Sequence, residues 1–196
     1  MGFIQANKQF IQRIHALVFS QGFLFGLIIA VNAVLMLLVK YYPSMDGPAH
    51  LYNSSLLSEL LFGDNPDLHN YFQISGFPLA NWIALFILSF FNLFLPAWIA
   101  EKILLLIYLI GISLAFRYLV KQINPEGLGL SFIIFPFIYS FLFHLGFYNY
   151  SLSFVMLFFI LGFWIKHQAC LSARVFVPVF FLMGLLYFSA LLSFLF

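Results

Sequence analysis

"YYPSMDGPAHLYNSS", residues 41–55, is the first polar stretch after a long apolar segment, and it combines an acid, a proline and a histidine. Proline is favoured in the first turn of a helix, where its missing N–H would have no partner. Leucines then recur at positions 51, 56, 57, 60 and 61. The pattern predicts an amphipathic helix that begins at Gly47 or Pro48, ends near Phe62 and lies along a membrane surface.

The composition of the 196-residue chain indicates an integral membrane protein. Hydrophobic residues make up 64% of it and charged residues only 7%, whereas a soluble domain carries about 25% charged residues. Lipid bilayer therefore surrounds most of the surface, and helices satisfy the backbone there. We expect an all-α, polytopic fold with 1–196 as a single membrane domain. The basic residues lie singly between apolar runs, which argues against a nucleic-acid partner.

Hydropathy predicts about six transmembrane helices separated by short polar breaks. A first span at 22–39 is preceded by an interfacial amphipathic lead-in, 1–18, and followed by one long polar loop, 41–78. Five further apolar runs follow, at 79–97, 103–120, 129–145, 151–165 and 175–196.

Asp46 and His50 are the strongest candidates for chemistry in the long loop. If a helix begins near Gly47, the acid lies at its start and the histidine projects from its first turn. One interpretation makes Asp46 a general base and His50 a substrate contact. The other makes Asp46 a helix cap and places His50 among lipid headgroups. Spacing alone leaves both interpretations open.

A second polar cluster, "FHLGFYNYS" at 143–151, contains His144 and Asn149 at the junction of two predicted spans. It fits either an aromatic belt interrupted by glycine or the polar lining of a headgroup-binding site. Glu101 and Lys102 are adjacent between two other spans, where a charged hairpin tip is expected. The sequence assigns no metal ligands and leaves open whether a divalent metal assists.

The order of these features resembles the GT-C superfamily of membrane glycosyltransferases, which includes lipid-A aminoarabinose transferases and protein mannosyltransferases. "YPSMDGPAHLYNSSLLSELL" is similar to the start of the acidic first loop, "GFPLANW" to the chain's return into the membrane, and "HLGFYNYSLSF" to a later feature of bacterial members. The resemblance spans residues 20–165. It differs in two respects, because Gly47 stands where a second acid is common and because members have about twice as many spans.

This resemblance implies a transferase that moves a sugar from a polyprenyl-phosphate donor to an extracytoplasmic acceptor. Asp46 would be the catalytic acid/base, with His50, His144 and Asn149 in the substrate-binding site. The chain would be the N-terminal part of a GT-C-like fold in the cytoplasmic (inner) membrane. The alternatives are a fragment of a transporter or flippase, and a non-catalytic assembly subunit or truncated, inactive copy.

The predicted orientation contains a conflict. Lys8 and Arg13 before the first span favour a cytoplasmic N-terminus, and the acidic-loop resemblance then places 41–78 outside. Strict alternation of six spans, however, leaves only Lys102 to join these two on the cytoplasmic side. The other five basic residues fall outside, against the positive-inside tendency.

Overall fold

The computed structural model describes residues 20–74, 80–169 and 172–195, and within these ranges the chain forms helices and no strands. The predicted lead-in, 1–18, lies outside the described residues, as does the end of the predicted loop from residue 75. The all-α prediction is confirmed for the part of the chain that the structure describes.

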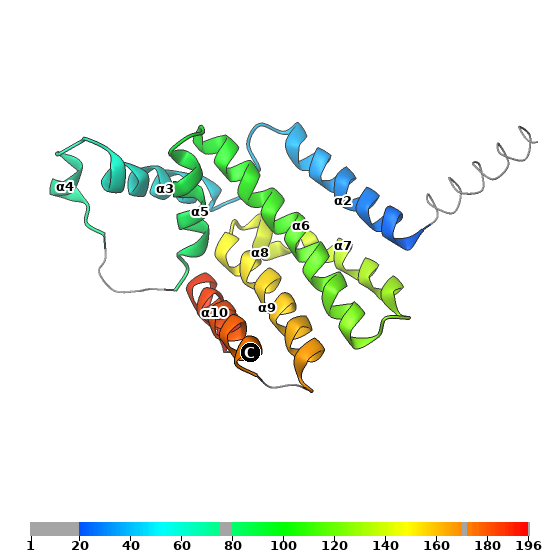
Figure 1. Cartoon of the computed structure of the whole chain (residues 1–196). Helices are drawn as coiled ribbons and strands as arrows, with labels where there is room; N and C mark the ends of the chain where they lie inside the picture. The colour runs from blue at the N-terminus through cyan, green and yellow to red at the C-terminus, as the bar shows by residue number, and fades with distance from the viewer. Residues whose placement is uncertain (1–19, 75–79, 170–171, 196) are drawn as a thin grey trace, which may run out of the picture.

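Three helices are long and apolar enough to cross a membrane: α2 (Gln21–Leu38), α6 (Ala97–Ile123) and α9 (Tyr148–His167). Figure 1 shows α6 between the other two. A Cβ on Gly162 of α9 would lie 2.7 Å from the Tyr118 ring of α6. Glycine thus lets these two helices approach closely, as is common inside membranes. Within the described residues three helices have this length and composition, and the count of six spans stays a prediction.

The predicted span 129–145 is a broken segment. It consists of a 3₁₀ helix, η1 (Leu128–Ile134), and two single-turn helices, α7 (Phe135–Ile138) and α8 (Phe141–His144). Ser140 interrupts it by capping α8, because its hydroxyl accepts a hydrogen bond from the N–H of Phe143 at 3.3 Å. The last apolar run holds α10 (Ala173–Ser189) and the short α11 (Leu191–Phe194).

The predicted span 79–97 is replaced by a short helix, α5 (Ile83–Asn92). Ten residues of α-helix extend about 15 Å, half of the roughly 30 Å hydrocarbon core of a bilayer. The C-terminal end of α5 contacts the loop helix α3 (Gly47–Phe62), where Asn92 donates a hydrogen bond to Ser54 at 2.8 Å. Ser58 of α3 also donates to the Ser89 carbonyl at 2.9 Å. Helix α5 therefore packs with the loop helix instead of forming its own span.

The helix α3 confirms the prediction from residues 41–55 at both ends. It begins at Gly47 with Pro48 in its first turn and ends at Phe62. A short helix, α4 (Leu68–Tyr71), follows. In Figure 1, α3 extends sideways from the bundle formed by α2, α6 and α9. Its predicted position along the membrane surface stays a prediction.

Contacts at the two ends of α6 fix the directions of the long helices. The Lys102 ammonium group donates hydrogen bonds to the carbonyls of Met36 and Val39 at the end of α2. The Arg117 guanidinium lies 4.4 Å from the Phe25 ring, near the start of α2. Helices α2 and α6 are therefore antiparallel. We call the end of the bundle where α2 ends and α6 begins the site end, and the opposite end the far end.

The remaining long segments connect the same two ends. Helix α9 begins at the site end, because the hydroxyl of Tyr148 donates a hydrogen bond to Glu101 near the start of α6. Helix α10 returns there, with Ser189 donating to the Asn149 carbonyl at 2.7 Å. The broken segment 128–144 also runs from the far end to the site end. Because α5 does not run from one end of the bundle to the other, residues 39–74 and 80–96 all lie at the site end.

This arrangement removes the conflict between the basic residues and the orientation. Two described basic residues, Lys40 and Lys102, lie at the site end, whereas four lie at the far end. The far-end residues are Arg117, Lys121, Lys166 and Arg174. Lys8 and Arg13 precede the far-end start of α2 in the sequence. By the positive-inside tendency, the far end is expected to be cytoplasmic and the site end extracytoplasmic.

Single-cysteine labelling tests this orientation. In a Cys170→Ala background, we expect Asn53→Cys and Asp67→Cys to react with a membrane-impermeant maleimide in intact cells, because both positions are exposed at the site end. Asn124→Cys, exposed at the far end, should react only after permeabilisation. Six alternating spans would instead place residue 124 outside together with residue 53, so labelling of all three in intact cells would contradict the arrangement.

Candidate active site

The Asp46–Gly47 peptide is held against the loop that precedes α9. The N–H of Asp46 donates a hydrogen bond to the Leu145 carbonyl at 2.9 Å, and that of Met45 donates to the His144 carbonyl at 3.3 Å. Gly146 has a φ of 88°, a conformation that favours glycine. A Cβ at Gly146 would lie 2.9 Å from the nitrogen of Gly47. The close backbone contact therefore depends on glycine at position 146.

Asp46 lines a polar cavity and does not act as a side-chain helix cap. It immediately precedes α3 with φ −94° and ψ −5°, and its carboxylate makes no capping hydrogen bond to the described first turn of that helix. The side chain is half-buried. The cavity has a volume of about 290 Å³ and is formed at the start of α3, before α5 and at the start of α9. Its lining residues are Asp46, His50, Asn81, Phe147, Tyr148, Asn149 and Tyr150.

His50 lies one helical turn beyond Asp46 in the same cavity. Its ring stacks on the Tyr148 ring, with 5.1 Å between centroids and 28° between planes. Burial lowers the pKa of His50, and this effect outweighs the backbone hydrogen bond with Gly146 and the Asp46 charge, which both raise it. The imidazole is therefore neutral at pH 7, and one of its nitrogens can accept a hydrogen bond.

A buried hydrogen-bond network lies behind this cavity wall. The Tyr148 hydroxyl donates to Oε1 of Glu101 at 2.6 Å and lies 2.8 Å from Oγ of Ser44. Because a phenol has one proton and Tyr148 uses it on Glu101, Ser44 must donate to Tyr148. Glu101 is only 2% exposed. The sequence predicted a charged hairpin tip at this position, and the structure corrects that prediction to a buried acid.

Gly47 lies directly against this network. A Cβ at position 47 would be 2.1 Å from Oγ of Ser44, 2.8 Å from the Tyr148 hydroxyl and 2.9 Å from Oε1 of Glu101. A side chain here would displace at least one of these three groups. Gly47 stands where a second acid is common in the GT-C superfamily. Its lack of a side chain leaves the space that the network occupies.

Asn149 lines the cavity, but both polar atoms of its amide bind backbone groups. Its Oδ1 accepts a hydrogen bond from the N–H of Ala84 in the first turn of α5 at 2.7 Å. Its Nδ2 donates to the carbonyl of Asn81 at 2.8 Å. Asn81 has a φ of 69°, an uncommon value outside glycine. Asn149 therefore fixes the start of α5, and its predicted substrate contact stays a prediction.

His144 does not line the cavity. Its side chain is exposed, its Nδ1 lies 3.1 Å from the hydroxyl of Tyr42, and the two rings are parallel to within 10°. Burial raises the pKa of the Tyr42 hydroxyl, so the phenol is protonated and shares a hydrogen bond with Nδ1 of His144. The structure thus brings Asp46, His50 and Asn149 together and places His144 beside them, on the peptide that anchors Met45.

The two basic residues near the bundle core point elsewhere. Lys102 is 4% exposed and binds the end of α2. Arg117 donates to Oγ of Ser131 at 2.9 Å at the far end. Among the described residues, no group of three or more His, Cys, Asp or Glu side chains is arranged to hold a metal ion. Polar groups of the cavity are thus the carboxylate, the imidazole, phenols and amides.

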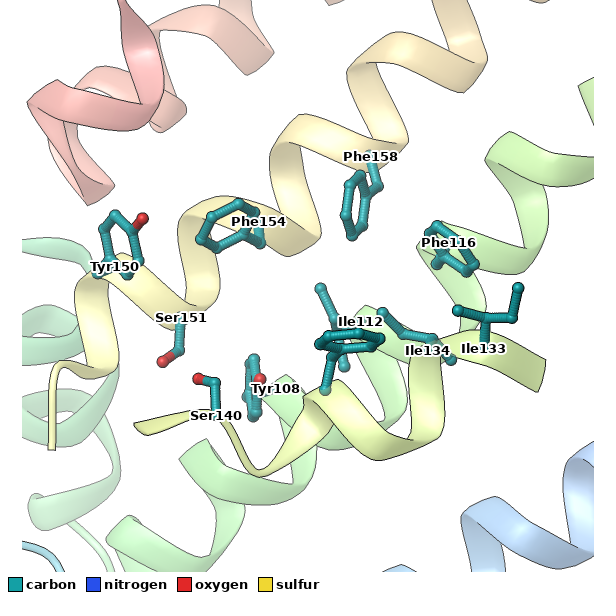
Figure 2. Close-up of a pocket in the computed structure, with 11 residues that line it drawn as sticks. Tyr108, Ile112, Phe116, Ile133, Ile134, Ser140, Tyr150, Ser151, Phe154 and Phe158 are labelled. Atoms are coloured by element: carbon teal, nitrogen blue, oxygen red, sulfur yellow. The ribbon is translucent and has the colours of Figure 1, made fainter. Parts of the chain in front are cut away.

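An apolar cavity of about 360 Å³ adjoins the polar one between α6, the broken segment and α9. Figure 2 shows Phe154 and Phe158 of α9 facing Ile112 and Phe116 of α6 across it. Tyr150 lines both cavities. A ligand with a polar head and an apolar chain therefore matches the chemistry of the two neighbouring spaces.

Comparisons with protein-family models, with curated proteins and with solved structures find no match for this chain. The resemblance to the GT-C superfamily consequently rests on the order of sequence features alone.

Substitution of Gly47 tests the packing around Asp46. We expect Gly47→Ala to lower the free energy of unfolding by about 1–3 kcal/mol, the usual cost of overpacking. The matched control is Gly184→Ala in α10, where a Cβ would meet nothing within 4 Å, and its stability should equal that of the wild type or exceed it by up to about 1 kcal/mol, because alanine is the better helix former. Chemical unfolding in detergent, followed by circular dichroism, measures both. Equal stabilities for the two variants would contradict the close packing at Gly47.

The buried imidazole gives a pH prediction. Because the pKa of His50 is lowered in the folded protein, the unfolded chain binds a proton first as the pH falls below its ordinary pKa of about 6.5. Stability should therefore decline as the pH drops from about 6.5 towards the lowered pKa. His50→Gln should remove part of that decline in thermal unfolding measured between about pH 7.5 and 5.5, one unit on either side of the ordinary pKa. An identical pH slope in this variant would contradict the burial of His50.

Proposed function

We propose that this chain is a membrane glycosyltransferase that uses a polyprenyl-phosphate sugar, with Asp46 as the base. The observation that carries the proposal is the environment of Asp46. An acid that begins a helix usually caps it, but this carboxylate makes no such bond and lines a polar cavity. It is therefore free to accept a proton from a bound hydroxyl group.

The proposed reaction needs only one base at the attacking side. The Asp46 carboxylate removes the proton of an acceptor hydroxyl while that oxygen attacks the anomeric carbon of the donor sugar. The bond from the anomeric carbon to the phosphate oxygen breaks, and polyprenyl phosphate leaves with the electron pair. The anomeric configuration is inverted. Neutral His50, one turn away, is placed to accept a hydrogen bond from a sugar hydroxyl.

Two further features support a lipid-linked donor. Tyr150 lines both the apolar and the polar cavity, so an isoprenoid chain and the sugar of such a donor would have neighbouring apolar and polar environments. The distribution of basic residues predicts an extracytoplasmic site end, the side on which a polyprenyl-phosphate sugar is used by the superfamily that the sequence resembles. The cytoplasmic (inner) membrane is the location that this proposal implies.

Replacement of Asp46 tests the proposal. Asp46→Asn keeps the shape of the side chain but removes its basicity, so we expect transfer to fall by about 10²- to 10⁴-fold. Membranes containing the protein would be supplied with a panel of polyprenyl-phosphate [¹⁴C]sugars, and labelled acceptor would be counted. The matched control is Asp67→Asn, an exposed acid that precedes α4, which should transfer at the wild-type rate. His50→Ala should reduce transfer less than Asp46→Asn does.

The outcome of this assay separates catalysis from folding. Because Asp46 makes no capping bond, Asp46→Asn should insert into membranes and unfold like the wild type. An Asp46→Asn protein with full transfer activity would refute the role of Asp46 as base.

A further inference from the structure

The Tyr148–Glu101 hydrogen bond is a buried polar contact that the proposed reaction does not use. Burial of a carboxyl group within a helical bundle is costly unless the group is satisfied. Glu101 is nevertheless 2% exposed on α6 and accepts a 2.6 Å hydrogen bond from Tyr148. This hydrogen bond satisfies the buried carboxyl group and joins α6 to the start of α9.

Tyr148 connects Glu101 to the polar cavity, because its hydroxyl and its ring have different neighbours. The hydroxyl is held between Glu101 and Ser44, while the ring lines the cavity and stacks on His50. The hydrogen bonds of the hydroxyl fix the outer end of the ring. Because a phenol O–H lies close to the ring plane, the bond to Glu101 also favours the ring plane on which the imidazole stacks. The backbone N–H of His50 donates to the Asp46 carbonyl at 3.0 Å, and its ring has a hydrogen bond with the Gly146 backbone in addition to the stack.

We propose that Glu101 is a positioning residue for the Asp46–His50 cavity, acting by hydrogen bonding to the Tyr148 hydroxyl and thereby fixing the ring on which His50 stacks. The functional value of this role rests on the proposed function, but the geometry itself is measurable without substrate. The role needs an acceptor oxygen at position 101 and not a negative charge. Glutamine should therefore replace Glu101, whereas leucine should not.

The ring stack gives a direct spectroscopic readout. The protein would be labelled with ¹³C-histidine in detergent, and the His50 ring signals would be assigned by their loss in His50→Gln. Stacking on Tyr148 shifts these signals upfield, and Tyr148→Leu, which removes the aromatic ring, defines the unstacked position. A purely structural defect elsewhere in the bundle would not move the His50 signals to that position.

We expect Tyr148→Phe and Glu101→Leu to lose most of the upfield shift and to broaden the His50 signals. Glu101→Gln should keep both the shift and the line width of the wild type. The matched control is Tyr108→Phe, which also removes a buried phenol hydroxyl on α6, where it binds the Ile138 carbonyl at 2.8 Å. This control should leave His50 unchanged. If Glu101→Leu does not fold, Tyr148→Phe decides alone.

Two results would overturn the positioning role. One is a wild-type His50 signal in both Tyr148→Phe and Glu101→Leu. The other is an equal loss in Glu101→Gln and Glu101→Leu, since that would make the charge, and not the hydrogen bond, responsible. Neither result bears on the Asp46→Asn transfer assay, so the failure of one proposal is distinguishable from the failure of the other.

Discussion

The hydrogen bond from Tyr148 to Glu101 joins the first turns of two parallel helices at one end of the bundle. Its length of 2.6 Å, together with the Ser44 contact, leaves no room for a side chain at Gly47. The backbone of Asp46 and Gly47 is consequently held between this bond and the left-handed turn at Gly146. The cavity that contains Asp46 and His50 exists because these three segments, distant in sequence, meet there.

The membrane explains why such a polar assembly lies at the end of the helices. A carboxyl group, an imidazole and several hydroxyls are expensive in the hydrocarbon centre but are tolerated near the interface when they bind one another. The apolar cavity extends from this assembly between α6 and α9, where the surroundings become largely apolar. The basic residues at the opposite end favour an orientation in which substrate would approach from outside the cytoplasm.

Features local in the sequence predicted the loop helix, whereas contacts between distant segments could not be predicted. Pro48 marks the start of α3 because a helix start depends on neighbouring residues. Hydropathy failed at residues 79–97, since it does not distinguish a span from a ten-residue apolar helix packed on α3. Ser140 likewise interrupts an apolar run through a local cap that hydropathy does not register.

The candidate site shows the same division. Asp46 and His50 are close in the sequence, and the sequence identified both as candidates. Asn149, also a candidate, lines the same cavity. The roles of Glu101 and Tyr148 were missed because these residues are 47 positions apart and meet only after the helices pack. An acid within an apolar helix was the available signal, but its neighbour Lys102 suggested an exposed hairpin tip. Lys102 instead caps α2 through two backbone carbonyls.

The segment before α3 packs against the turn before α9, and this packing builds the cavity. Cysteine cross-linking between positions 45 and 144 tests it, because the main chains of Met45 and His144 are joined by a hydrogen bond and both side chains are exposed. In membranes and in a Cys170→Ala background, mild oxidation should link Met45→Cys to His144→Cys. Met45→Cys paired with Asn124→Cys, at opposite ends of the bundle, should not cross-link. Absence of the 45–144 cross-link, or equal cross-linking of the two pairs, would contradict the packing of these two segments.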